Sequence, residues 1–71
     1  MEHYLIRATI IPVVVEMIQE HYQLTEQEAL DTFYRSATGA SLADDRTGLY
    51  GQSPLYIFGL YKEEQAEING A

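Results

Sequence analysis

Residues 24–61 read LTEQEALDTFYRSATGASLADDRTGLYGQSPLYIFGLY and carry most of the signals that decide the fold. Thr25 with Glu28 three residues later is a capping box, in which each side chain accepts a hydrogen bond from a backbone N–H at the start of a helix. Ser53 followed by Pro54 fits an N-cap and a first helical position. These signals predict two helices, one over residues 26–37 and one over residues 54–66.

The first of these helices also has the charges that a helix dipole favours. Glu26 and Glu28 lie in its first turn and Arg35 in its last. Asp31 and Arg35, four residues apart, are placed to form a weak exposed ion pair. Gly39 is expected to end the helix in a left-handed conformation. We expect its inward face to hold Ala29, Leu30, Phe33, Tyr34 and Ala37.

The segment that joins these two helices is rich in turn residues. Ser41 with Asp44 three residues later predicts a single helical turn over 42–45. Residues 47–51 are then a connector. The following apolar residues, 55–61, point in almost every direction around a helix, which is more than one core contact needs. A buried strand over 55–61 is the alternative on propensity alone, and Gly59 weakens both interpretations.

The residues before position 24 predict a third helix, over residues 4–22. Apolar residues recur there at intervals of three and four, with a continuation to Tyr22 that lacks any turn signal. Pro12 leaves two alternatives open: one helix that kinks at Pro12, or a helix capped by Thr9 with Pro12 in its first turn. The recurring apolar residues are Ile6, Ile10, Val14, Met17 and Ile18. The expected fold is therefore an all-α domain of three main helices and one short helical turn, spanning 1–71 as a single unit.

Charge and composition exclude several classes of partner. The chain has 71 residues, 11 acidic against 4 basic, a formal charge of −7 and no cysteine. This balance repels nucleic-acid phosphates and anionic lipid heads, and it suits a basic protein surface. The longest apolar run, 8–15, is shorter than the roughly 20 residues that span a bilayer, and it makes a poor secretory signal. We therefore expect a cytoplasmic protein that binds neither nucleic acid nor membranes.

The sequence offers no catalytic, cofactor or metal constellation. His3 and His21 have no metal-ligand spacing, and no cysteine completes a site with them. Ser36 and Ser41 lack an identifiable base, and the glycines do not form a phosphate-binding loop. We expect no enzyme and no cofactor. A helix-turn-helix is a weaker alternative, because its recognition segment at 42–45 would carry two carboxylates with only Arg46 beside it.

Tyrosine is the positive functional signal. Six tyrosines in 71 residues is a high content, and the tyrosine ring combines a large apolar face with a polar tip that suits protein interfaces. The same rings could equally fill the rim of a small core. We therefore expect a protein-interaction module that contacts a basic partner protein, or alternatively a second copy of itself as a structural homo-oligomer. The expected contact residues are Tyr34, Tyr50, Tyr56, Tyr61, Glu63 and Glu64.

Two blocks of this sequence resemble a family of short bacterial proteins of unknown function. The first, A-L-x-x-F-Y-x-S, spans Ala29–Ser36, and the second, T-G-L-Y-x-Q-S-P-x-Y, spans Thr47–Tyr56. The resemblance carries no established catalytic or binding residue onto these positions. Some members look like partners encoded beside larger genes, including ADP-ribosyltransferase-like toxins. The resemblance thus implies an antitoxin-like or accessory role.

Overall fold

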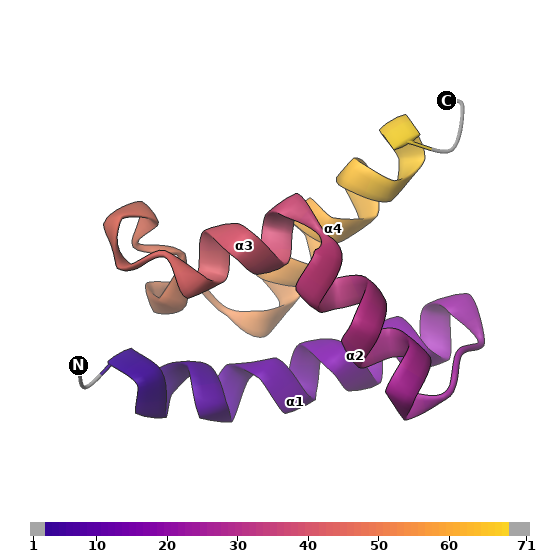
Figure 1. Ribbon diagram of the computed structural model, residues 1–71, viewed down its shortest axis with the longest axis horizontal. Helices are drawn as coiled ribbons and strands as arrows, with labels where there is room; N and C mark the ends of the chain where they lie inside the picture. The colour runs from indigo at the N-terminus through magenta and orange to yellow at the C-terminus, as the bar shows by residue number, and fades with distance from the viewer. Residues whose placement is uncertain (1–2, 69–71) are drawn as a thin grey trace.

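The computed structural model describes residues 3–68, with side chains from residue 8 onward, and these residues are mostly helical and contain no strand. The all-α prediction is therefore confirmed, and the strand alternative for 55–61 is wrong. One long helix runs along the 35 Å axis of the molecule, and the other helices pack on one side of it (Figure 1). The elements in chain order are α1 (His3–Tyr22), α2 (Glu26–Arg35), α3 (Ala37–Ala43), the single 3-10 turns η1 (Asp45–Thr47) and η2 (Leu49–Gly51), and α4 (Pro54–Ile68).

Helix α1 continues through Pro12 without interruption, so the alternative in which Thr9 caps a shortened helix is wrong. Proline removes the hydrogen bond that the carbonyl of Ala8 would otherwise accept. Both Ala8 and Pro12 are exposed, so water can reach that carbonyl. The opposite side of the helix buries Ile10, Val14 and Ile18, as the spacing predicts. Met17 is half-buried, and the side chain of Ile6 lies outside the described residues.

A left-handed residue ends α1 and turns the chain toward α2. Gln23 has φ 58°, the only positive φ at a non-glycine residue in the described chain. The Leu24 N–H donates to the Gln19 carbonyl at 3.1 Å, and the Gln23 side-chain amide donates to the Glu20 carbonyl at 2.8 Å. These bonds satisfy carbonyls that a helix end leaves without partners. The sequence has no glycine at this position from which the left-handed turn could be predicted.

Helix α2 begins at the predicted capping box. The Glu28 N–H donates to Thr25 Oγ1 at 3.1 Å, and the Thr25 N–H donates to Glu28 Oε1 at 3.0 Å. The predicted pair of Asp31 and Arg35 is present at 3.3 Å. The predicted end at Ala37 is wrong, because Ser36 adopts an extended conformation (φ −80°, ψ 159°) and stops the helix at Arg35.

Ser36 also begins α3, so the predicted role of Gly39 is wrong as well. Gly39 is helical and lies in the first turn of α3, with no left-handed conformation. Its lack of a side chain serves close packing instead. A Cβ atom added there would overlap the carbonyl oxygen of Phe33. Glycine is required because two short helices meet at one residue.

The predicted helical turn over 42–45 is replaced by the end of α3 and by η1. Asp44 does not belong to a turn capped by Ser41. It caps η1 through a 3.0 Å hydrogen bond from the Arg46 N–H, and it pairs with the Arg46 guanidinium at 2.9 Å. Gly48, at φ 70°, supplies the left-handed residue between η1 and η2. The signal at Ser41 failed because Ser36 had already begun the helix five residues earlier.

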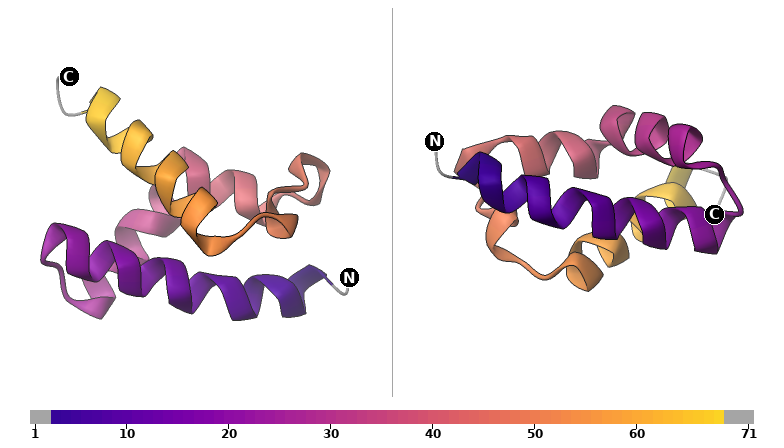
Figure 2. Two further views of the ribbon diagram at one scale, coloured as in Figure 1. Left: turned by 180° about the vertical axis from the view of Figure 1, so that it is seen from behind. Right: turned by 90° about the horizontal axis from the view of Figure 1, so that it is seen from below.

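Helix α4 starts at Pro54 as predicted and extends two residues beyond the expected end, to Ile68. The Tyr56 N–H donates to Ser53 Oγ at 3.1 Å, which confirms the predicted cap. The start of α4 lies near the middle of α1. From there to its own C-terminal end, α4 slants away from α1 (Figure 2). It therefore has one flank beside α1 and the other beside α3. The buried core comprises Ile10, Val14, Val15, Ile18, Ala29, Phe33, Leu42, Leu49, Ile57, Phe58 and Tyr61.

Candidate functional site: an acidic groove between α3 and α4

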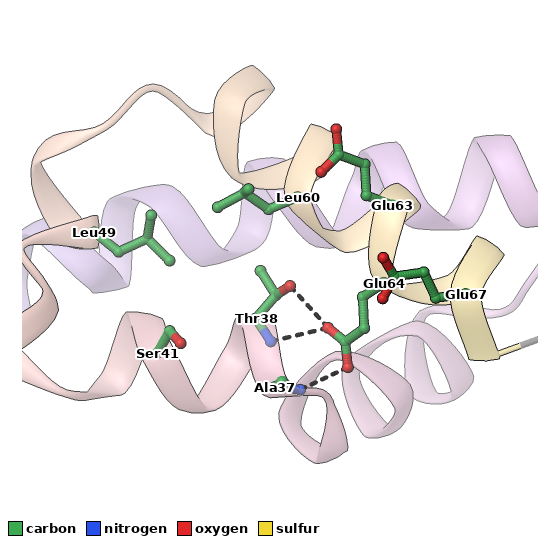
Figure 3. Close-up of a pocket in the computed structure, with 8 residues that line it drawn as sticks. All are labelled: Ala37, Thr38, Ser41, Leu49, Leu60, Glu63, Glu64 and Glu67. Carbon is green, nitrogen blue, oxygen red and sulfur yellow. Dashed lines mark hydrogen bonds between the residues drawn. The ribbon is translucent and has the colours of Figure 1, made fainter.

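A groove of about 300 Å³ lies between α3 and α4. Its floor is largely apolar, since the side chains of Leu49 and Leu60 point toward each other across it (Figure 3). Its rim on the α4 side consists of carboxylates. We call it the acidic groove, and the residues that line it are Ala37, Thr38, Ser41, Leu49, Leu60, Glu63, Glu64 and Glu67.

Glu64 reaches across the groove and binds the start of α3 (Figure 3). Its Oε2 accepts a hydrogen bond from the Ala37 N–H at 2.7 Å. Its Oε1 accepts from the Thr38 N–H at 3.0 Å and from Thr38 Oγ1 at 2.8 Å. These contacts join residues 26 and 27 positions apart in the chain. They fix α4 to the junction of α2 and α3 and so set the width of the groove.

Ser36 and Glu64 together satisfy every backbone donor in the first turn of α3. Ser36 Oγ accepts from the Gly39 N–H at 2.9 Å, and the Ser36 N–H itself donates to the Phe33 carbonyl at 3.1 Å. In a local capping box the third helical residue would be a glutamate. Here that position is Gly39, and the carboxylate comes from α4 instead. The N-terminal end of α3 is thereby capped by residues from two elements.

This arrangement stabilises the charged form of Glu64. Burial alone would raise the pKa of the carboxyl, because it removes water from the charged form. The hydrogen bonds from Ala37 and Thr38 outweigh burial, and the net result is a pKa below the usual value. Glu64 is therefore an ionised structural group at neutral pH, with both oxygens engaged.

Glu63 and Glu67 differ from Glu64, since neither carboxylate has a hydrogen-bond or ion-pair partner among residues 8–68. The carboxylate of Glu63 points away from that of Glu64 (Figure 3). Two carboxylates four residues apart on a helix repel each other, and both lie at the end of α4 where the helix dipole is negative. The rim thus concentrates negative charge that the described part of the chain leaves uncompensated.

The six predicted contact residues do not lie together. Glu63 and Glu64 line the acidic groove, and Tyr56 is an exposed residue of the first turn of α4, on the same helix side as Glu63 seven residues later. Tyr34 is exposed on α2, while Tyr50 is half-buried in η2 against the core.

Tyr61, the remaining predicted contact residue, is a core residue that is only 2% exposed. Its ring packs 6.1 Å from the ring of Phe33 and 5.9 Å from that of Tyr22. Burial raises the pKa of Tyr22, and the electrostatic interaction with Tyr61 raises it further. The structure places Tyr61 away from the surface, and we assign it no part in the groove.

Of the eight residues that line this groove, the sequence-based prediction named only Glu63 and Glu64 as contact residues. No sequence pattern predicts that Leu49 and Leu60 line the same groove, because they belong to η2 and α4 and come together only in the folded chain. The acidic end of α4 was the available signal. A run of glutamates placed against the helix dipole breaks a local rule, and such violations gather at functional sites.

No group of three or more metal-ligating side chains comes together within the described residues. None of the helices in residues 3–68 has the length and apolar character needed to cross a membrane. Comparison with protein-family models, curated proteins and solved structures finds no significant match to this chain. The resemblance of residues 29–36 and 47–56 to a bacterial family stays a prediction.

Proposed function

We propose that this chain is a non-enzymatic protein-interaction module that binds a basic segment of a partner protein in the acidic groove. The observation that supports this most is the pair of uncompensated carboxylates, Glu63 and Glu67, beside an apolar floor. A partner lysine or arginine would lay its methylene stem on Leu49 and Leu60 and bring its charged head to the rim. It would also relieve the repulsion between the two glutamates.

The basic residues whose side chains the structure describes do not neutralise this rim. Arg35 and Arg46 pair with Asp31 and Asp44 on other elements. Lys62 is next to Glu63 in sequence, but its ammonium lies 5.0 Å from the centre of the Phe58 ring, on the α1 side of α4. Arg7 lies outside the residues whose side chains are described. A cation from another protein is therefore the complement that the rim fits.

Tyr56 extends the same surface toward the start of α4. It is 52% exposed, and its N–H rather than its hydroxyl forms the helix cap with Ser53. Its ring is therefore free to pack on a partner without disturbing the fold. Tyrosine rings of this kind often contribute much of the binding energy at protein interfaces.

The antitoxin-like or accessory role rests on the family resemblance alone. The proposal keeps only its general part, that the chain binds another protein in the cytoplasm. Nucleic-acid binding gains no support from the pair α2 and α3. Helix α3, with the sequence ATGASLA, has no basic residue to contact phosphates.

The proposal is tested with a matched pair of double variants that remove the same charge. Glu63→Gln with Glu67→Gln neutralises the rim, and Glu16→Gln with Glu26→Gln neutralises two exposed glutamates on α1 and α2. Each tagged variant is used to capture proteins from a lysate of the source organism. The affinity of each variant for a captured partner is then measured by titration. We expect the rim variant to lose at least about tenfold in affinity and the control less than about twofold.

Equal losses in the two double variants would contradict the proposal, because the attraction would then depend on net charge alone. Tyr56→Ser is the second test, and we expect it to weaken the same partner with an unchanged helical circular dichroism spectrum. Tyr61 is unsuitable for such a test, since its replacement would leave a hole in the core.

A further inference from the structure

A second groove lies on the other flank of α4, between α4 and α1. It encloses about 320 Å³ and is lined by Met17, Glu20, His21, Leu55 and Phe58. Leu55 is 69% exposed, a high value for a large apolar side chain. Val13, one helical turn before Met17 on the same side of α1, is 39% exposed. We call this surface the α1–α4 groove.

One uncompensated charge of each sign lies at or beside the α1–α4 groove. Glu20, on the α1 wall, has no ion-pair partner among residues 8–68. Lys62 is not one of the lining residues, but its ammonium lies 5.0 Å from the centre of the ring of Phe58, which is, and it lacks a carboxylate within ion-pair distance in that same range. An anion and a cation thus flank an apolar centre formed by Met17, Leu55 and Phe58.

We propose that a second copy of this chain docks on the α1–α4 groove through a two-fold axis. In such an interface the same patch occurs on both subunits, so Glu20 of each protomer would meet Lys62 of the other. The two Leu55 side chains would pack between these ion pairs. The mixed charge of this groove complements itself, whereas the acidic groove presents carboxylates alone and would repel a copy of itself.

The size of the chain supports the same occupant. A domain of 71 residues buries a small fraction of its unfolded surface and gains stability from association. Covering Leu55, Val13 and Met17 would enlarge the apolar area removed from water. The proposal is independent of the acidic groove, since the two surfaces lie on opposite flanks of α4.

The first test measures mass by sedimentation equilibrium at 0.15 M salt, where repulsion between the two acidic chains is largely screened. We expect the chain, 8.1 kDa as a monomer, to reach twice that mass as its concentration rises. Leu55→Asp should leave the protein monomeric with an unchanged helical spectrum. Tyr34→Asp, which alters an exposed tyrosine of α2 that lines neither groove, should dimerise like the natural chain.

The second test reverses the charge of Glu20 in one variant and that of Lys62 in another. Glu20→Lys and Lys62→Glu should each weaken the dimer by about tenfold or more, because like charges would then face each other. An equimolar mixture of the two variants should restore association, since two ion pairs form in the mixed dimer, one natural and one with its charges exchanged. A chain that stays monomeric up to about 1 mM, a dimer that survives Leu55→Asp, or a mixture that fails to associate would each overturn the proposal.

Discussion

Replacing Glu64 by alanine tests the contact that fixes the acidic groove. The substitution removes three hydrogen bonds to α3, two of them from backbone N–H groups of the first turn. Hydrogen bonds to a charged group contribute about 1.5–3 kcal/mol each where water is excluded, and loss of a helix cap costs about 0.5–2 kcal/mol. Water can replace the carboxylate at the exposed Ala37 N–H. It replaces it less well at Thr38, which is only 7% exposed.

We therefore expect Glu64→Ala to lower the free energy of unfolding by about 2 kcal/mol. A chain of this length has a total stability of about 4–10 kcal/mol, so the loss is a large share of it. The corresponding fall in melting temperature is about 8–16 °C. The assay is thermal and urea unfolding at pH 7, followed by circular dichroism at one fixed protein concentration.

Glu63→Ala is the matched control, because it removes a neighbouring carboxylate that has no hydrogen-bond partner among residues 8–68. Its effect should stay within about 0.5 kcal/mol of zero. If Glu64→Ala and Glu63→Ala gave the same small change, the contact between α4 and α3 would not stabilise the fold. Glu64 would then not fix the width of the acidic groove.

The contribution of Glu64 should also depend on pH. Its pKa is lower in the folded chain than in the unfolded chain, where it is about 4.3. Stabilisation is then fully present above pH values of about 4.3 and is lost as the pH falls through the lower pKa of the folded state. The difference in stability between the natural chain and Glu64→Ala should shrink between pH 7 and pH 3. A difference that stays constant over this range would show that the charge of Glu64 is not involved.

Three further substitutions test the backbone. Gly39→Ala should destabilise by about 2 kcal/mol or more, since its Cβ would overlap the Phe33 carbonyl. Gly59→Ala, in a helix position with open space around it, should stabilise by about 0.5–1 kcal/mol. Urea unfolding measures both, and equal signs would contradict the packing assigned to Gly39. Gln23→Gly should stabilise by about 0.5–1 kcal/mol by relieving φ 58°; a loss measured by thermal unfolding would mean that the Gln23 side-chain hydrogen bond dominates.

Local signals predicted the elements whose caps are local. The capping box at Thr25 and the pair of Ser53 and Pro54 placed the starts of α2 and α4 correctly. The prediction failed at Ser36, because its helix start depends on Glu64, a residue 28 positions later. It failed for the same reason in assigning Gly39 a left-handed conformation, since the overlap with Phe33 exists only in the folded chain. A single sequence shows a residue's neighbours along the chain, and the acidic groove is formed by neighbours in space.

The apolar residues of α4 lie on nearly every side of the helix because they serve different parts of the fold. Ile57, Phe58 and Tyr61 face the core, and Leu60 contributes to the floor of the acidic groove. Leu55 and Tyr56 remain, and both are exposed: Leu55 lines the α1–α4 groove, and Tyr56 lies on the helix side of Glu63. A helix that only covered a core would carry polar residues at both positions. The charges divide in the same way, with carboxylates alone beside α3 and a mixture of signs beside α1. Each flank of α4 therefore matches a different occupant, and the exposed residue that begins each flank, Tyr56 or Leu55, distinguishes the two binding reactions by mutation.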